Sequence, residues 1–462
     1  MSHDSAELYR RRPAVLDGPL RRRAGAGVRQ PAVRVLRGPD PREHRRAAVR
    51  LFPALPAFDI MYASKACANL AVLDVVRRAG CGVEINSGGE LYKALRTGFA
   101  PAQIVFNGVS KSTAEVEFAV ETGIHSLNVD SLAELERIIA VAGARGLQAG
   151  VTLRLVPSVM GGTVAGFETG HAGSKFGMLV SELDAAAALL SRHAAAVRFR
   201  GFHFHVGSQV VNPAAFADGL EVVLRAAVEL HARTGLKPEC INMGGGFPIP
   251  LVPDGQLPTH RDGSRLPPAL EQLLLGQLSL AEVAARTAAV WDRTAGDVIP
   301  RHATRVLIEP GRRVVGDAGL LLTRIESRKT RRDGAQWLMI DAGFNTLPET
   351  LWYDWYYHAV SATRHDCPHD APFRLGGPLC DTGDSQHDER GTGKLPDVRR
   401  LPAATAVGDV LAVLGAGAYA IEQQNNYNGR PRAAAILLRG AEVVPIARRE
   451  TYSDLVAREL WP

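Results

Sequence analysis

From about residue 45, short apolar runs alternate with stretches in which apolar residues recur every three or four positions. The runs are typical of buried β-strands, and the stretches are typical of amphipathic helices. Eight strands are predicted in this part of the chain, at 58–64, 81–85, 103–106, 125–128, 149–155, 197–205, 239–242 and 304–309. Helices are predicted in the gaps, most clearly at 69–78, 90–95, 131–139 and 214–233.

Eight strand–helix units in one stretch predict a closed (β/α)8 barrel of the TIM type. A doubly wound open sheet is the alternative, because the same alternation of strands and helices fits both folds. Two helix starts are legible, since Ser87 with Glu90 and Ser131 with Glu134 each fit a reciprocal capping box.

After about residue 315 the pattern changes to short apolar runs between Gly, Pro and Asp turns, which predicts a mostly β domain. Its clearest strands are at 337–341, 409–414 and 433–438, and residues 383–404 are predicted to form a loop or insertion. The first 45 residues show no convincing periodicity. The chain therefore divides into an atypical Arg-rich segment (1–45), a barrel (46–315) and a C-terminal β domain (316–462).

The net charge of +6 is concentrated at one end of the chain, because residues 1–50 hold 13 Arg and no Lys against 5 acidic residues. The rest of the chain has a balance of −2, which argues against nucleic-acid binding by the folded body. No apolar run has the length of a membrane span, and no secretory signal is visible. The five cysteines are odd in number and scattered without metal spacing, so we expect a reducing cytoplasm and no metal site.

Several chemically reactive residues follow predicted strands, where barrels place their sites. Lys65 follows the first strand, and a lysine there can hold an aldehyde cofactor as a Schiff base. Gly244–Gly246 follow the seventh strand, where backbone amides can approach a phosphate, although a plain loop is the commoner use of three glycines. Glu309 ends the eighth strand and needs a partner if buried: a protonated pyridine nitrogen, or Arg312 or Arg313 in an ordinary ion pair.

Two histidines, His203 and His205, lie two residues apart on the sixth strand and therefore face the same side. They lack a third metal ligand nearby, so His205 is better suited to face a flat cofactor ring, while His203 is interpreted as a hydrogen-bonded core residue. In the second domain, Cys380 could donate a proton to a carbanion and Asp381 could hold a substrate amine.

Taken together, these residues resemble the fold-type III pyridoxal-phosphate decarboxylases, which include the diaminopimelate and ornithine decarboxylases, and the motifs are most similar to the diaminopimelate branch. Nine short motifs carry the resemblance in sequence order: Tyr62-Ala-Ser-Lys65, Glu84-Ile-Asn-Ser-Gly-Gly-Glu90, His205-Val-Gly-Ser208-Gln209, Gly244–Gly246, Glu309-Pro-Gly-Arg312, Asp341-Ala-Gly-Phe-Asn345, Gly377-Pro-Leu-Cys380-Asp381, Gly417-Ala-Tyr419 and Tyr427-Asn-Gly-Arg-Pro-Arg432.

The resemblance implies an alanine-racemase-like barrel followed by a β-barrel or sandwich domain, pyridoxal 5'-phosphate as cofactor, and α-decarboxylation of an amino acid to an amine and CO2. It implies that Lys65 binds the cofactor, His205 stacks on its ring and Glu309 pairs with the ring nitrogen. The phosphate would be held by Ser208, Gly244, Gly245, Gly246, Arg312 and Tyr419. The catalytic Cys380 and the substrate-binding Asp381 would come from the partner subunit of a homodimer.

The chain departs from the family pattern around the substrate. In the family pattern, diaminopimelate enzymes have an arginine shortly after the position of Asn345, and this chain has Glu349 there. They have a glutamate after the catalytic cysteine, and this chain has Asp381 at that position. Glu349, Asp381 and Tyr427 are therefore the expected substrate-binding residues, and the aromatic run 351–358 could line an altered pocket. Decarboxylation of ornithine, of lysine or of a carrier-bound amino acid is the alternative within the family.

Three readings of other classes stay open at this stage. A fold-type III racemase would need a tyrosine base opposite Lys65, and the Cys380–Asp381 pair favours decarboxylation instead. A non-catalytic pyridoxal-phosphate-binding protein would not need Cys380. An unrelated barrel enzyme would make all nine motifs fortuitous.

Overall fold

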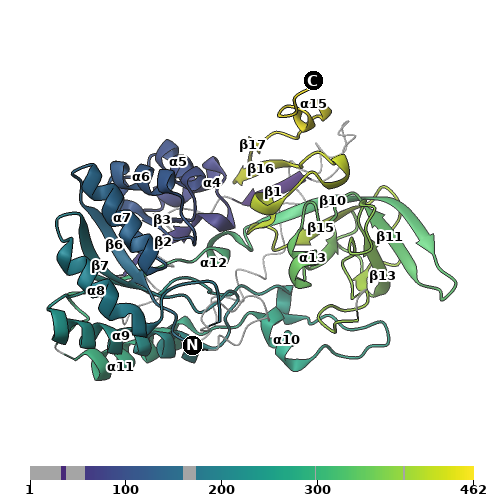
Figure 1. The fold of residues 1–462 in the computed structure, drawn as a ribbon. Coiled ribbons are helices and arrows are strands. Elements are labelled where there is room, and N and C mark those ends of the chain that lie inside the picture. Colours follow the sequence, from purple (N-terminus) through teal and green to yellow (C-terminus); the bar gives the residue numbers. More distant parts are fainter. Residues whose placement is uncertain (1–32, 38–57, 160–172, 297, 389–390, 462) are drawn as a thin grey trace. The chain divides into compact units, whose positions relative to one another are not determined.

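The computed structural model describes residues 33–37, 58–159, 173–296, 298–388 and 391–461 (Figure 1). The chain divides into two compact units. One consists of Pro39–Pro248 and Gln277–Val314 and is called here the barrel unit. The other consists of Met1–Gly38, Ile249–Gly276 and Val315–Pro462 and is called the β unit.

The barrel unit contains a closed barrel of parallel strands. Its strands in order are β2 (Phe58–Ala63), β3 (Gly82–Ile85), β4 (Ile104–Phe106), β5 (Ser126–Val129), β6 (Ala149–Arg154), β7 (Val197–His203), β8 (Cys240–Asn242) and β9 (Arg305–Ile308). Pairing of β9 with β2, with Ile60 opposite Ile308, closes the barrel and confirms the TIM-type prediction over an open sheet. Buried apolar side chains such as Met61, Val105 and Leu307 fill its interior.

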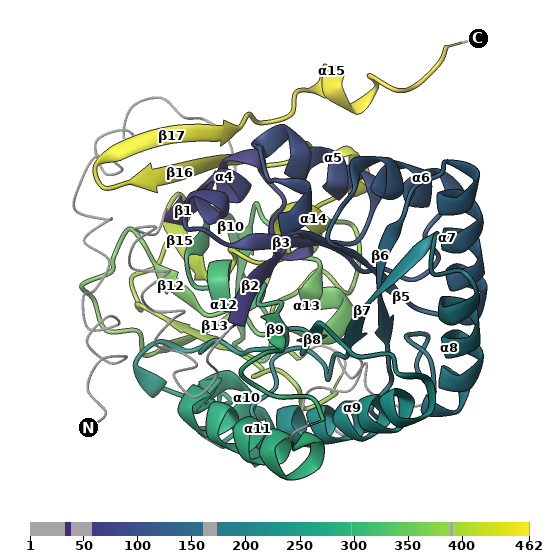
Figure 2. The same cartoon turned by 90° about the vertical axis from the view of Figure 1, so that its left-hand side faces the viewer.

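Helices surround this barrel on the outside (Figure 2). They are α4 (Leu70–Arg78), α5 (Gly88–Thr97), α6 (Thr113–Thr122), α7 (Leu132–Ala144), α8 (Leu183–Arg192), α9 (Pro213–Thr234) and α11 (Leu280–Ala295). Shorter helical turns are η2 (Ser64–Ala66), η3 (Pro101–Gln103), η4 (Val180–Glu182) and α12 (Arg312–Val315). The four helices predicted most clearly from the sequence correspond to α4, α5, α7 and α9.

In each of the two predicted capping boxes, the serine contact is present and the glutamate contact is not. Ser87 and Ser131 each accept a hydrogen bond from the backbone amide three residues later. The glutamates do not reach back to the capping residues, however. Oε2 of Glu90 accepts from the amide of Asn86, and Oε1 of Glu134 accepts from the buried Lys111 ammonium, which is a stronger partner than a backbone amide.

The β unit contains a nine-stranded sheet, as the β-rich pattern after residue 315 predicted. Its strands are β1 (Val33–Arg37), β10 (Gly319–Thr330), β11 (Gln336–Ile340), β12 (Ala359–Ser361), β13 (Ala371–Gly376), β14 (Arg399–Leu401), β15 (Val410–Leu414), β16 (Ala434–Arg439) and β17 (Glu442–Ala447). Short helices are α10 (Pro268–Leu275), α13 (Glu349–Tyr353), α14 (Ala420–Gln423) and α15 (Tyr452–Leu455), with turns η5 (Pro253–Gly255) and η6 (Tyr427–Gly429).

Two strands of this unit lie in segments where the sequence predicted no strand. β1 lies within the first 45 residues and pairs antiparallel with β10 and parallel with β16; the rest of that segment lies outside the described residues. β14 lies inside the predicted loop 383–404 and pairs with β13. Among the described residues, no single helix is long and apolar enough to cross a membrane, and only the interrupted pair α10 and α11 meets that test when taken together.

Candidate active site

Lys65 lies in the turn η2, directly after β2 at the carboxyl end of the barrel strands. Its Nζ atom is 3.3 Å from Oε2 of Glu84 on β3, and the Glu84 side chain is fully buried. Burial raises the pKa of Glu84 to about 7, even though the Lys65 ammonium lowers it. Glu84 can therefore accept or release a proton beside the Lys65 amine at neutral pH.

Glu309, directly after β9, is a second buried carboxylate at the same end of the barrel. Its Oε2 accepts from Nδ2 of Asn107 at 2.8 Å and lies 3.3 Å from Nε2 of His203, and its Oε1 accepts from Nδ2 of Asn242 at 2.7 Å. Burial alone would raise its pKa, but His203, Lys65 and Asn242 lower it to about 2. Glu309 is thus held ionised by its own network rather than by an arginine pair.

These groups belong to a set of polar side chains at the carboxyl end of the barrel interior. Each strand supplies one, within the strand or shortly after it: Lys65, Glu84, Asn107, Asn128, Thr152, His203, Asn242 and Glu309. Asn107 donates to both Glu84 and Glu309, and its Oδ1 accepts from Nδ2 of Asn128. Oδ1 of Asn128 in turn accepts from the Thr152 hydroxyl. Buried polar groups need such partners, so the network fixes each member.

Sequence reasoning named Lys65 and Glu309 as members of this network and Glu84 only within a motif. It missed Asn107 and Asn242 and assigned His203 to the core. The available signal was a polar residue at the end of each predicted strand, because these positions converge once the barrel closes.

The glycine loop after β8 packs closely against His205 and against the backbone. Nδ1 of His205 accepts from the Gly245 amide at 3.0 Å, so the neutral ring carries its proton on Nε2. Burial, followed by the charges of Lys65 and Arg154, holds the pKa of His205 well below its ordinary value. A Cβ atom on Gly245 would lie 2.2 Å from the Glu309 carbonyl oxygen, and one on Gly246 would lie 2.4 Å from another carbonyl oxygen, so only glycine fits.

Three further residues lie at or shortly after the carboxyl ends of barrel strands. Arg312 begins α12 and is buried, and Ser208 is half-buried beside Gln209, whose φ of 54° is unusual for a residue other than glycine. Arg154, the last residue of β6, is buried with its guanidinium group 4.5 Å from the ring centre of Phe176. Sequence reasoning missed Arg154, although it lies one residue before the end of the predicted strand 149–155.

The remaining expected site residues belong to the β unit. Cys380 and Asp381 are both exposed within their own chain, and the Cys380 amide donates to Oδ1 of Asn428 at 2.7 Å. Tyr427 is 45% exposed and stacks on Phe344, with ring centres 5.5 Å apart.

Two other residues of this unit have unusual settings. Glu349 begins α13 and is buried, and its Oε2 accepts from the Tyr357 hydroxyl at 3.0 Å. Tyr419 has a φ of 63°, a strained value for an aromatic residue of the kind that concentrates at functional sites.

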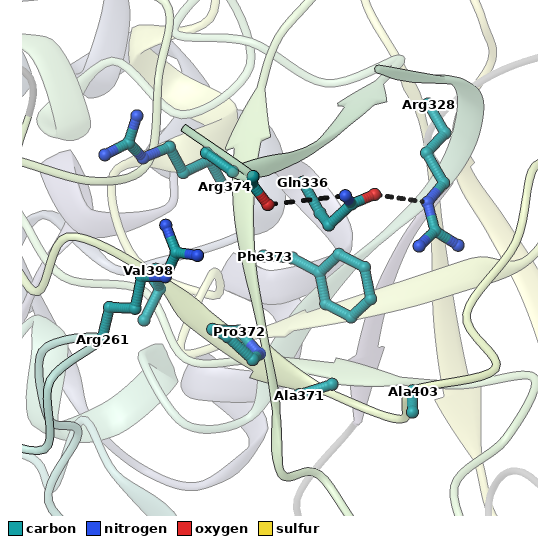
Figure 3. A pocket seen from close by; sticks show the side chains of 11 residues that line it. Arg261, Arg328, Gln336, Ala371, Pro372, Phe373, Arg374, Val398 and Ala403 are labelled. Atoms are coloured by element: carbon teal, nitrogen blue, oxygen red, sulfur yellow. Dashed lines mark hydrogen bonds between the residues drawn. The ribbon is translucent and has the colours of Figure 1, made fainter. Parts of the chain in front are cut away.

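A cavity of about 270 Å³ lies in the β unit. Figure 3 shows the side chains that line it. Its lining includes Phe373, Pro372 and Val398, with the guanidinium groups of Arg261 and Arg374 on one side of the Phe373 ring and that of Arg328 on the other. The side chain of Arg328 is held there by a hydrogen bond from Nε to Gln336, at 3.1 Å. None of the expected site residues lines this cavity.

Residues 42–316 of the chain match a family model described as "Pyridoxal-dependent decarboxylase, pyridoxal binding domain". The chain belongs to the pyridoxal-dependent decarboxylase family. Pyridoxal 5'-phosphate is accordingly its cofactor, and the chain is a carboxy-lyase that acts on an amino acid, as the sequence motifs indicated.

Relatives of this decarboxylase extend over nearly the whole chain. Diaminopimelate decarboxylase from Methanocaldococcus jannaschii is 33% identical over 88% of this chain and 84% of its own length, and that from Pseudomonas aeruginosa is 35% identical over 87% and 86%. The crystal structure of the M. jannaschii enzyme with L-lysine is similar with a TM-score of 0.77 and 30% identity, covering 93% of this chain and 92% of that one.

The donor set of the barrel unit fits pyridoxal phosphate. The cofactor presents an aldehyde, a basic ring nitrogen, a flat ring and a phosphate. Lys65 offers an amine, Glu309 an ionised carboxylate and His205 a neutral imidazole. The glycine loop after the seventh barrel strand and Arg312 after the eighth lie where barrels of this type commonly bind phosphate.

Proposed function

We propose that this decarboxylase removes the α-carboxylate of a free diamino acid of the diaminopimelate class, which yields lysine and CO2 from diaminopimelate itself. The observation that carries the proposal is the intact Lys65–Glu84–Glu309 network in a chain that matches diaminopimelate decarboxylases over almost their full length. The L-lysine bound to the similar M. jannaschii enzyme has the structure of the expected product.

The residues of the barrel unit would hold the cofactor at four places. Lys65 would bind its aldehyde carbon, Glu309 would pair with its ring nitrogen and His205 would face its ring. The phosphate would be held by Ser208, Gly244–Gly246 and Arg312 of this unit; Tyr419, which the family resemblance also assigns to the phosphate, belongs to the β unit. When bound, pyridoxal phosphate supplies an electron-withdrawing ring that takes up the electron pair left by the departing carboxylate.

Glu84 prepares Lys65 for this chemistry. An amine is a nucleophile only after it has lost its proton, and Oε2 of Glu84 is within 3.3 Å of Nζ with a pKa of about 7. Glu84 therefore takes the Lys65 proton when the amine must attack and returns it when the amine leaves. Glu309 stays ionised throughout, because its pKa of about 2 is far below that of Glu84.

Cys380 is assigned the return of a proton to the α-carbon, and Asp381 the substrate amine. Both are exposed in their own chain, which supports their action in the partner subunit of a homodimer with composite active sites. None of the five cysteines forms a disulfide bond in the part of the chain that the structure describes, which supports a reducing cytoplasmic location.

A second candidate substrate is favoured by the residues that depart from the family pattern. Glu349 offers a carboxylate where diaminopimelate enzymes resemble one another in having an arginine, but its Oε2 already accepts from Tyr357 inside the unit. A carboxylate in this region together with Asp381 would favour a distal ammonium group over a distal carboxylate. Ornithine or lysine is therefore the second candidate substrate, whereas the comparisons give no support to a carrier-bound one.

Cofactor binding and subunit assembly can be tested together with two variants. Lys65→Ala should remove both the visible absorbance of bound cofactor and the activity, while Cys380→Ala should keep the absorbance and retain only a small residual activity. Because a heterodimer of the two would contain one intact composite site, a mixture should regain up to roughly a quarter of wild-type activity. A colourless wild-type protein that ignores added pyridoxal phosphate would overturn the proposal, and a mixture without recovered activity would overturn the composite site.

The substrate is tested by measuring CO2 release from meso-diaminopimelate, ornithine and lysine under identical conditions. The highest kcat/KM should be obtained with diaminopimelate. A higher value with ornithine or lysine would establish the second candidate and assign the specificity change to the Glu349–Asp381 region.

A further inference from the structure

The backbone of Cys380 is held by a side chain from a distant part of the sequence. Oδ1 of Asn428 accepts a hydrogen bond from the Cys380 amide at 2.7 Å, although the two residues are 48 positions apart. Asn428 has a φ of 55° and a ψ of 26°, which is the left-handed region that asparagine tolerates better than most residues. The residue type thus satisfies both the turn and the contact with Cys380.

The turn that contains Asn428 is anchored on the expected substrate-facing segments of the β unit. Arg430 donates from its guanidinium group to the Pro378 carbonyl at 3.1 Å, two residues before Cys380. At the other end of the turn, the Asn425 amide donates to the Asn345 carbonyl at 2.9 Å. The turn is therefore hydrogen-bonded both to the loop of Cys380 and to the segment that leads into α13.

A second contact fixes the other side of the Cys380 loop. Oδ2 of Asp384 accepts from the Leu379 amide at 2.7 Å, and its Oδ1 accepts from the Phe344 amide at 2.8 Å. Since the amides of Leu379 and Cys380 are both engaged, the direction in which the Cys380 side chain leaves the backbone is set by these two acceptors.

We propose that Asn428 is a positioning residue that fixes the Cys380 thiol for its proton transfer. This inference rests on the proposed role of Cys380. Asn428 is exposed, so its hydrogen bond contributes only about 1 kcal/mol to folding stability at most. Proton transfer depends far more steeply on geometry, because a misplacement of about 1 Å can cost roughly 100-fold in rate.

The test compares kcat and KM of holoenzyme variants with the wild type. Asn428→Gly removes the acceptor while glycine keeps the left-handed backbone, and Asn428→Asp keeps an acceptor oxygen at the same place. We expect Asn428→Gly to lower kcat roughly 10- to 100-fold with KM and the visible cofactor absorbance unchanged. Asn428→Asp should recover most of that loss.

A double-mutant cycle with Cys380→Ala separates positioning from a general structural role. If Asn428 acts through Cys380, adding Asn428→Gly to Cys380→Ala should change kcat by less than about twofold, because the thiol is already absent. An equal loss in both backgrounds, or no loss in the wild-type background, would overturn the inference. If Cys380→Ala itself retained full kcat, the proposed role of Cys380 would fail instead, and the two failures are therefore distinguishable.

Discussion

Glu84→Gln is expected to make the protein more stable and less active. Glu84 is fully buried, and its pKa of about 7 in the folded protein compares with 4.5 for an ordinary glutamate. Between these values the folded state binds a proton that the unfolded state has lost, so stability falls as the pH rises through this window. At about 1.4 kcal/mol per pKa unit, Glu84 should lower the free energy of unfolding by roughly 2.5 kcal/mol between pH 5 and pH 8.

Glutamine removes this dependence because it resembles the protonated carboxyl and still accepts from Asn107. The assay is urea unfolding of wild type and variant at several pH values, with cofactor removed so that Lys65 is free to pair with residue 84. The variant should match the wild type near pH 5 and exceed its free energy of unfolding by roughly 2 to 3 kcal/mol at pH 8. Its kcat in the holoenzyme should fall roughly 100-fold through loss of the proton acceptor.

Parallel stability curves for the two proteins from pH 5 to pH 8 would refute the burial argument for Glu84. Undiminished kcat in the variant would refute its role as the proton acceptor of Lys65. The two readouts are independent, so one part of the reasoning can fail while the other stands.

Two further predictions concern the glycine loop and a buried ion pair. The Cβ atom of Gly245→Ala would lie 2.2 Å from a backbone carbonyl oxygen, so this variant should bind the cofactor at least about tenfold more weakly in a titration of visible absorbance. The control is Gly143→Ala on α7, whose Cβ atom would meet no other atom within 4 Å and which should bind the cofactor as the wild type does. Glu134→Gln leaves the buried Lys111 ammonium without its carboxylate partner and should lower the free energy of unfolding, measured in urea, by roughly 3 to 5 kcal/mol. The exposed Glu282→Gln should cost under about 0.5 kcal/mol, and equal losses in the two glutamate variants would contradict the argument.

The eight barrel strands could be predicted from the sequence because their signals are local. Each strand is a short apolar run, and the closed barrel follows from their number and spacing. β1 could not be found this way, since its five residues are held by β10 and β16, whose sequences lie several hundred positions later. The aromatic run 351–358 was likewise ambiguous. The structure buries Trp355, Tyr356 and Tyr357 in the β unit.

The capping glutamates show the same limit at the level of single residues. The spacing of Ser131 and Glu134 fits a capping box, and the serine half of it forms. Glu134 instead binds Lys111, which lies 23 positions earlier and reaches it only once the chain has folded. Spacing along the chain predicted that the Glu134 side chain could reach a nearby backbone amide. It did not predict that the carboxylate would bind Lys111 in the folded protein.

By itself, the sequence determined where the barrel strands run and which polar residues follow them. Both depend on residues that are neighbours in the chain: the period of the apolar positions, and the residue types at the end of each apolar run. Only the tertiary structure decided what those residues do. Glu84 and Glu309 are both glutamates at the ends of apolar strands, yet one has its pKa raised to about 7 and the other lowered to about 2. Burial acts in the same direction on both, since it raises the pKa of each carboxyl group. The difference comes from the neighbours that barrel closure brings to each. His203 and Asn242 donate to Glu309 and lower its pKa, whereas the charges of Glu309 and Glu90 raise that of Glu84.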